Sequence, residues 1–92
     1  MDGEVRLDLV GHCVLLPDRT AALPTREFLL LRYLMNKAGE VCTREELMAS
    51  VWGYDFEADS NVVDVYISRL RAKIPNRMIE TVRHVGYYFV SA

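Results

Sequence analysis

Residues 61–74 hold the side chains best suited to contact another molecule. Arg69, Arg71 and Lys73 are cations spaced by two, and Ser68 adds a short hydroxyl beside them. An arginine can donate two parallel hydrogen bonds to a guanine edge or clamp a phosphate, and a serine can bond either. These residue types point to recognition of a nucleic acid and carry no nucleophile–base pair.

Helical periodicity divides the same segment into two faces, since successive residues are turned by about 100°. The residues of one side are apolar and predict a core stripe: Val63, Ile67, Leu70 and Ile74. The opposite side mixes small and polar groups, with two cations on its flanks: Asn61, Val65, Ser68, Arg69 and Ala72, then Arg71 and Lys73. This face fits a DNA major groove, where a valine can contact a thymine methyl. A solvated face with an arbitrary set of charges is the alternative.

The charges are unevenly distributed along the chain. Residues 1–60 carry six Lys and Arg against eleven Asp and Glu, whereas residues 61–92 carry five against two. The net charge is therefore −5 in the first part and +3 in the second, within a total of −2. A basic face on an acidic body suits a negatively charged partner, although a small domain can also vary by a few charges by chance.

Length and composition limit the classes of protein to which the chain can belong. Ninety-two residues, 51% hydrophobic and 26% charged, predict one folded domain spanning 1–92. The longest apolar run is far shorter than the roughly 20 residues that cross a bilayer. Because residues 1–4 are acidic and lack an apolar stretch, we expect no secretory signal there. Cys13 and Cys42 lie 29 positions apart without metal-ligand spacing. We therefore expect no metal, no cofactor, no disulfide and a cytoplasmic location.

The expected elements begin with a small antiparallel sheet in residues 1–24, its third strand at 21–23. A core of three helices follows in residues 25–74. Thr25 is the expected N-cap of the first helix, and Gly39 its left-handed C′ residue. Thr43 and Glu46 match a capping box at the start of the second helix, which ends at Gly53.

The third helix is expected to start at a cap among residues 59–61 and to continue to Lys73 or Ile74, because Pro75 prevents continuation. A β-hairpin with its tip near Gly86 follows in residues 79–90. This order predicts an α+β winged helix-turn-helix, with the hairpin as the wing.

Further contacts follow from that geometry. Arg83 and His84 lie at the wing tip, and Thr43 and Trp52, at the two ends of the second helix, lie near the expected backbone crossing. The N-terminus of the second helix could offer N–H groups to a phosphate, although its own glutamates oppose an anion there.

Four segments resemble the winged-helix output domain of OmpR/PhoB-type response regulators: 23–35 (LPTREFLLLRYLM), 43–54 (TREELMASVWGY), 63–73 (VDVYISRLRAK) and 81–89 (TVRHVGYYF). The resemblance covers about 70 residues in the order and spacing of the family, and the combination is specific although each piece alone is weak. It implies a four-stranded N-terminal sheet, three helices and a C-terminal hairpin. It also implies sequence-specific binding of double-stranded DNA, usually as a head-to-tail pair on direct repeats.

The resemblance also implies roles for single positions. The recognition-helix positions that contact bases and phosphates hold Val65, Tyr66, Ser68, Arg69 and Arg71. Asn61 stands where relatives often place a phosphate-binding arginine, and Trp52 matches a tryptophan that borders the DNA backbone. Residues 53–60 match a segment that touches RNA polymerase in some members. Arg83, His84 and Tyr88 belong to the wing.

Several positions depart from the family pattern. Tyr88 replaces a frequent minor-groove arginine, His84 a glycine, and Tyr66 a histidine, while Asn61 and Ser68 replace arginines. Because lost cations mean fewer counterions released, we expect weaker and less salt-dependent binding than in a typical relative.

The family places this domain under the control of a phosphorylated receiver domain, which these residues do not contain. We favour the interpretation that the chain is the output half of a longer regulator, and a stand-alone form is the alternative.

Two other functions are weighed against DNA binding. An enzyme is disfavoured because His12 and His84 are distant in sequence, with His12 expected on the sheet surface, and because no phosphate loop or metal spacing appears. Cys13 and Cys42 are interpreted as small core residues. A winged helix that contacts proteins is the stronger rival, with Tyr54 and Phe56 as candidate anchors.

Overall fold

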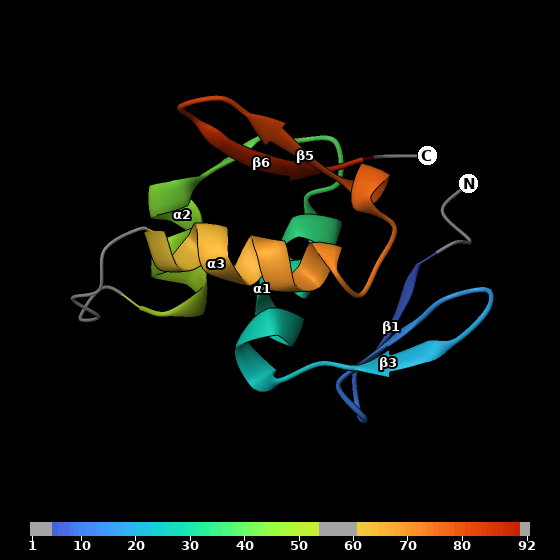
Figure 1. Ribbon diagram of the computed structural model, residues 1–92. Helices are drawn as coiled ribbons and strands as arrows, with labels where there is room; N and C mark the ends of the chain where they lie inside the picture. The colour runs from blue at the N-terminus through green and yellow to red at the C-terminus, as the bar shows by residue number, and fades with distance from the viewer. Residues whose placement is uncertain (1–4, 54–60, 91–92) are drawn as a thin grey trace.

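The computed structural model describes residues 5–53 and 61–90, which form three helices and two small antiparallel sheets (Figure 1). In chain order the elements are β1 (Arg6–Asp8), β2 (Cys13–Leu15), β3 (Thr20–Ala22), α1 (Thr25–Asn36), β4 (Cys42–Thr43), α2 (Arg44–Val51), α3 (Asn61–Arg71), the 3₁₀ turn η1 (Asn76–Met78), β5 (Ile79–Val82) and β6 (Gly86–Phe89). The predicted α+β winged-helix architecture is confirmed.

The N-terminal sheet has the order β1-β2-β3, and Val14 at its centre is fully buried. Three strands are present in the described residues, where the family resemblance implied four. The third covers Thr20–Ala22 instead of the expected 21–23. Leu23 lies just after β3 and is 5% exposed, so its side chain packs in the core.

Helix α1 crosses the middle of the molecule and supplies much of the core, with Phe28, Leu31 and Leu34 all buried. The expectation that Thr25 caps this helix is wrong. Thr25 is already its first residue, Pro24 occupies the cap position, and no side chain caps the helix. A proline is tolerated there because the N–H that it lacks would have no partner within the helix, while its carbonyl oxygen accepts from the Phe28 N–H at 2.9 Å.

Gly39 adopts the expected left-handed conformation, with φ of 87°. It lies two residues beyond the C-cap Lys37 instead of directly after it, and its N–H donates to the Phe89 carbonyl oxygen at 2.8 Å. The turn therefore joins the end of α1 to β6.

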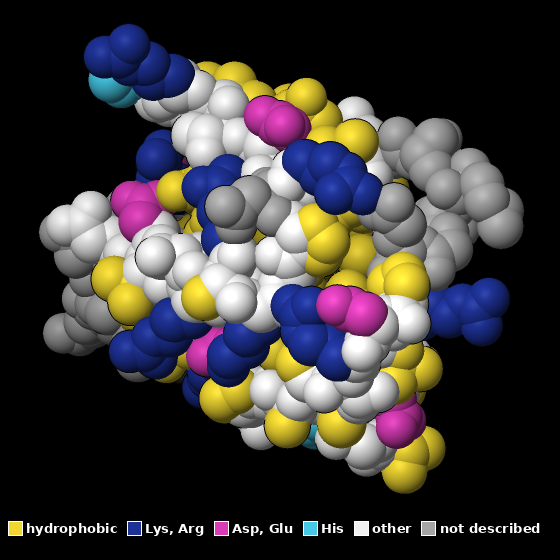
Figure 2. All heavy atoms as spheres, turned by 45° about the vertical axis from the view of Figure 1, so that its right-hand side comes forward, with side chains coloured by type: hydrophobic (Ala, Val, Ile, Leu, Met, Phe, Trp, Pro, Cys, Tyr) yellow, Lys and Arg dark blue, Asp and Glu magenta, His cyan; other side chains and the backbone are white. Residues whose placement is uncertain are grey.

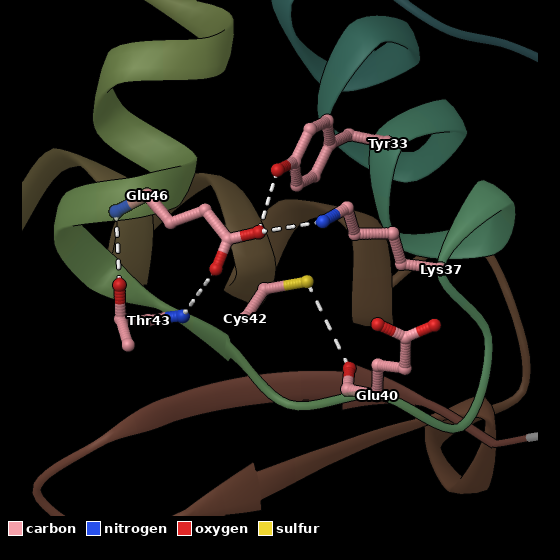
Figure 3. Close-up of polar contacts among 6 residues, drawn as sticks. All are labelled: Tyr33, Lys37, Glu40, Cys42, Thr43 and Glu46. Carbon is pink, nitrogen blue, oxygen red and sulfur yellow. Dashed lines mark hydrogen bonds and ion pairs between the residues drawn. The ribbon is translucent and has the colours of Figure 1, made fainter.

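The predicted capping box at the start of α2 is confirmed. The Glu46 N–H donates to Thr43 Oγ1 at 3.0 Å, and the Thr43 N–H donates to Glu46 Oε1 at 3.3 Å. Glu46 also accepts a hydrogen bond from the Tyr33 hydroxyl at 2.5 Å and pairs with Lys37 at 3.4 Å (Figure 3). The hydrogen bond from Tyr33 is the main reason that the pKa of Glu46 lies below its usual range. One carboxylate thus caps α2 and binds it to α1.

Helix α3 packs against α1 and α2, and it ends at Arg71, two residues short of the predicted Lys73. Its expected core stripe is confirmed: Val63, Ile67, Leu70 and, just beyond the helix, Ile74 are at most 3% exposed. The predicted cap positions 59 and 60 lie outside the described residues, as do Tyr54, Phe56 and most of the segment 53–60.

The second sheet has the order β4-β6-β5, so the short strand after α1 pairs with the C-terminal hairpin. The sequence predicted the hairpin tip near Gly86. In the structure Gly86 is instead the first residue of β6. A Cβ there would approach the Cys42 carbonyl oxygen to 1.9 Å, so glycine is required by the close approach of β4. The tip is formed instead by residues 83–85, where His84 has φ of 66°.

The arrangement brings three regions to one end of the molecule. The start of α3, helix α2 and the turn between β5 and β6 lie together on the left in Figure 1, whereas the N-terminal sheet lies at the opposite end, below the wing. The N–H of Arg44, the first residue of α2, donates to the Val85 carbonyl oxygen at 3.3 Å. The wing tip is thereby attached to the N-terminus of α2.

The environment of Glu46 predicts an acid-sensitive fold. A carboxyl group whose pKa is lowered on folding stabilises the protein above its unfolded pKa, about 4.3, and loses that effect as the pH falls through the folded value. We expect Glu46→Gln to reduce the stability difference between pH 7 and pH 3, measured by urea unfolding. Tyr33→Phe should also reduce this stability difference, because it removes the hydroxyl that donates to Glu46. An unchanged difference in both variants would contradict the role assigned to Glu46.

The core stripe predicts a large effect at Leu70, which is fully buried. Leu70→Ala should lower the free energy of unfolding by about 2–5 kcal/mol, because transfer energy is lost and a cavity remains. Val65→Ala, on the exposed side of the same helix, serves as the control and should change it by less than about 0.5 kcal/mol. Similar losses in the two variants would mean that the faces of α3 are wrongly assigned.

Candidate nucleic-acid interface

The face of α3 opposite the core stripe is open to solvent. Val65 is 47% exposed, and Asn61, Ser68, Arg69 and Ala72 are exposed as well. An apolar side chain, a hydroxyl and a guanidinium therefore project from a helix whose other side is fixed in the core. This is the arrangement that a major groove can accept, since each of these groups has a complement on a base edge.

Tyr66 differs from its neighbours on α3 because its side chain is half-buried. Its ring meets that of Trp52 edge-on, with centroids 5.1 Å apart and planes at 76°. The Arg69 guanidinium lies 4.8 Å from the centre of the Tyr66 ring. Trp52, the C-cap of α2, thus reaches the exposed side of α3 through Tyr66.

Arg71 and Lys73, both assigned to the contact surface from sequence, are half-buried and bind other segments of the same chain. Arg71 donates to the Ile79 carbonyl oxygen at 2.7 Å and to Thr81 Oγ1 at 2.9 Å. The Lys73 ammonium pairs at 2.6 Å with the carboxylate of Glu27, which is 3% exposed. Arg71, the last residue of α3, is turned towards β5, and Lys73, just beyond the helix, towards α1. They hold the end of the helix in place.

Arg83 and His84 are both exposed at the wing tip, as expected. The turn is closed by the Val85 N–H, which donates to the Val82 carbonyl oxygen at 2.9 Å. Thr43 lies close by at the N-terminus of α2, with its hydroxyl engaged in the capping box. We call the exposed residues Val65, Ser68, Arg69, Arg83 and His84 the α3–wing surface.

Tyr88 lies on the side of the wing away from α3. It pairs across the hairpin with Glu80, whereas its neighbour Tyr87 pairs with Thr81, the residue bound by Arg71. Successive residues of a strand point to opposite faces, so Tyr88 shares the outer face with an acidic side chain. The structure does not bring it to the α3–wing surface.

Sequence reasoning missed a polar cluster that joins α2, α3 and β6. Arg44 Nε donates to Asp64 Oδ1 at 2.9 Å, and the Tyr87 hydroxyl donates to the same carboxylate oxygen. The hydrogen bond to Asp64 raises the pKa of Arg44, while burial is the main reason that the pKa of Tyr87 is raised. The one signal in the sequence was Asp64, the first of only two acidic residues in the basic segment 61–92.

Ion pairing leaves a mixed surface. Figure 2 shows dark-blue Lys and Arg side chains in several separate groups, with magenta Asp and Glu side chains among them. Arg19, Arg44 and Lys73 are each paired with a carboxylate. Within residues 61–92, Lys73 is paired with Glu27 and Arg71 donates to β5, so the excess positive charge of this segment is only partly available to a partner.

The residues considered for catalysis do not come together. His12 is half-buried, and its ring stacks on Phe28 with centroids 4.4 Å apart, so the expected position on the sheet surface is wrong. Cys42 is fully buried, and burial raises its pKa to about 11. Cys13 is half-buried. Within residues 5–53 and 61–90, no group of acidic, His or Cys side chains could hold a metal ion, and no helix is long and apolar enough to span a bilayer.

Known proteins provide an independent comparison. Residues 18–89 match the family described as "Transcriptional regulatory protein, C terminal". The transcriptional regulatory protein HprR of Escherichia coli is 41% identical over 91 residues, which cover 95% of this chain and 41% of HprR. The chain thus spans about two fifths of the length of this relative.

Two solved structures share the fold. Response regulator DrrB of Thermotoga maritima, described as an OmpR/PhoB homologue, superposes with a TM-score of 0.87 at 34% identity, covering 99% of this chain and 43% of DrrB. The DNA-binding domain of response regulator AdeR, solved in complex with an intercistronic region, superposes with a TM-score of 0.82 at 26% identity. The match covers 97% of this chain and 96% of that domain. With the family match over residues 18–89, these likenesses establish that the chain belongs to the OmpR/PhoB family of winged-helix DNA-binding domains of transcriptional response regulators.

Proposed function

We propose that this chain binds double-stranded DNA in a sequence-dependent manner, with α3 in the major groove and the β5–β6 wing beside it. The observation that carries the proposal is the division of α3 into a fully buried stripe and an exposed face holding Val65, Ser68 and Arg69. Because one side of the helix is fixed in the core, its exposed side chains are presented to a partner in one orientation. Recognition of base edges requires such a fixed orientation.

Each part of the surface has a distinct role in this proposal. Arg69 and Ser68 donate to base edges or phosphates, and Val65 contacts a thymine methyl. Arg83 and His84 at the wing tip approach the neighbouring backbone or minor groove. Thr43, at the N-terminus of α2, borders the DNA backbone beside the wing tip. Asn61 and Trp52 contact the DNA backbone, as the family pattern implies.

The same surface sets the expected strength of binding. Arg71 and Lys73 are held by internal partners, so Arg69 and Arg83 are the cations of the α3–wing surface. Few phosphate contacts mean few released counterions and a shallow dependence of the binding constant on salt. Tyr88, which stands where relatives often carry a minor-groove arginine, adds no cation to this surface.

The wider context of the proposal comes from the family. A DNA-reading domain of this type works in the cytoplasm as a transcriptional regulator with no catalytic step of its own. It would follow a receiver domain and bind direct repeats as a head-to-tail homodimer. The segment 53–60 would touch RNA polymerase; apart from Gly53, it lies outside the described residues.

The proposal is tested by selecting duplexes from a random pool and measuring their affinity by fluorescence anisotropy at several salt concentrations. Arg69→Ala should weaken binding to a selected duplex by about 1–3 kcal/mol and reduce its preference over random DNA. Arg32→Ala is the matched control, since Arg32 is an exposed arginine of α1 outside the α3–wing surface.

Equal weakening by the two substitutions would show that only overall charge matters, against a reading role for Arg69. If the wild-type chain binds no DNA even at low salt, the DNA-binding proposal fails. A winged helix that contacts proteins, the rival considered from sequence, would then take its place.

Arg71 should behave differently from Arg69, although both are arginines of one helix. Arg71→Ala removes two hydrogen bonds from a charged group and leaves the Ile79 carbonyl oxygen without this donor. We expect the free energy of unfolding to fall by about 1–3 kcal/mol, whereas Arg69→Ala should leave it nearly unchanged. Chemical denaturation of both variants checks this, and equal stability of the two would contradict the tethering role of Arg71.

A further inference from the structure

Arg69 is an exposed side chain whose guanidinium is nevertheless held in place. Tyr66 and Arg69 are three residues apart on α3, so their side chains are neighbours on the helix surface. The guanidinium lies 4.8 Å from the centre of the Tyr66 ring, within the range of a cation–π contact. In the part of the chain that the structure describes, no carboxylate pairs with Arg69.

The Tyr66 ring is itself held in place by Trp52. Trp52 meets it edge-on at 5.1 Å, and this T-shaped geometry is a favourable one for two aromatic rings. Tyr66 is half-buried against the core, in contrast to the exposed Val65 and Ser68. The ring therefore has little freedom to turn away from Arg69.

Trp52 is in turn bound to α1. The Arg26 guanidinium lies 5.9 Å from the centre of the Trp52 ring and donates to the Val51 carbonyl oxygen. That carbonyl belongs to the last turn of α2, where helix carbonyls have no partner within the helix. Arg26 thus fixes the end of α2, including Trp52.

From this series of contacts we infer that Tyr66 is a positioning residue for sequence recognition: its ring, held by Trp52 and Arg26, orients the Arg69 guanidinium towards DNA. The inference rests on the proposed function and deepens it. A free arginine loses considerable side-chain freedom when it binds. Stacking on Tyr66 removes part of that loss before DNA arrives.

A direct DNA contact by Tyr66 would have a different signature. A positioning residue affects binding only through Arg69, so its removal should have no effect once Arg69 is absent. Because the charge of Arg69 remains, the salt dependence should stay the same while discrimination between duplexes falls. A phosphate contact by Tyr66 itself would weaken specific and random DNA alike.

The experiment compares Tyr66→Leu, which removes the ring, with Tyr66→Phe, which keeps it, each in the wild-type and Arg69→Ala backgrounds. Affinity is measured on a selected duplex and on random DNA at several salt concentrations. We expect Tyr66→Leu to reduce the specific-to-random ratio by about two- to fivefold, the value of an exposed cation–π contact. Tyr66→Phe should retain the ratio, and in the Arg69→Ala background both substitutions should leave it unchanged.

An independent readout needs neither DNA nor a stable variant. In the NMR spectrum of the wild-type chain, the Arg69 side-chain protons should be shifted upfield by the Tyr66 ring. The shift should persist in Tyr66→Phe and disappear in Tyr66→Leu. Thermal unfolding followed by circular dichroism establishes whether each variant is folded, and the wild-type spectrum remains decisive if Tyr66→Leu is not.

Two results would overturn the inference while leaving the proposed function intact. The first is unshifted Arg69 protons in the wild-type chain. The second is a loss on Tyr66→Leu that is equally large in the Arg69→Ala background. In either case, selective binding by the wild-type chain would still support DNA recognition. Absence of DNA binding by the wild-type chain would overturn the proposed function, and the inference with it.

Discussion

Burial of one side of α3 is the constraint on which the rest of the structure depends. Val63, Ile67 and Leu70 are at most 1% exposed, so the helix cannot rotate without bringing apolar surface into water. The opposite face is thereby determined, because the positions between these residues must point outwards. The exposed valine, serine and arginine owe their fixed orientation to the packing behind them.

Polar contacts complete the attachment of α3 at both ends. Near its start, Asp64 binds Arg44 of α2 and Tyr87 of β6, and at its end Arg71 binds β5. Beyond the helix, Lys73 pairs with the buried Glu27 of α1. Two cations that in sequence look like DNA contacts are therefore used to hold the helix. The domain has a smaller basic surface than its C-terminal charge indicates.

Several features that depend on local sequence were predictable, although the N-cap expected at Thr25 was not. The capping box of Thr43 and Glu46 and the apolar stripe of α3 involve residues three or four positions apart, so spacing alone indicates them. Gly86 was misplaced because its requirement comes from Cys42, 44 positions earlier, which approaches β6 only in the folded chain. For the same reason the partners of Arg71, and the stacking of His12 on Phe28, could not be deduced from the sequence.

The most direct test of this account is an NMR titration of the isotope-labelled 92-residue chain with a selected duplex. If the exposed face of α3 reads DNA, backbone signals of Val65, Ser68 and Arg69 and of the wing tip should shift. Signals of the N-terminal sheet, such as those of Leu7 and Val14, should stay in place. Shifts confined to that sheet, or none at saturating DNA, would contradict the assignment of α3 as the recognition helix.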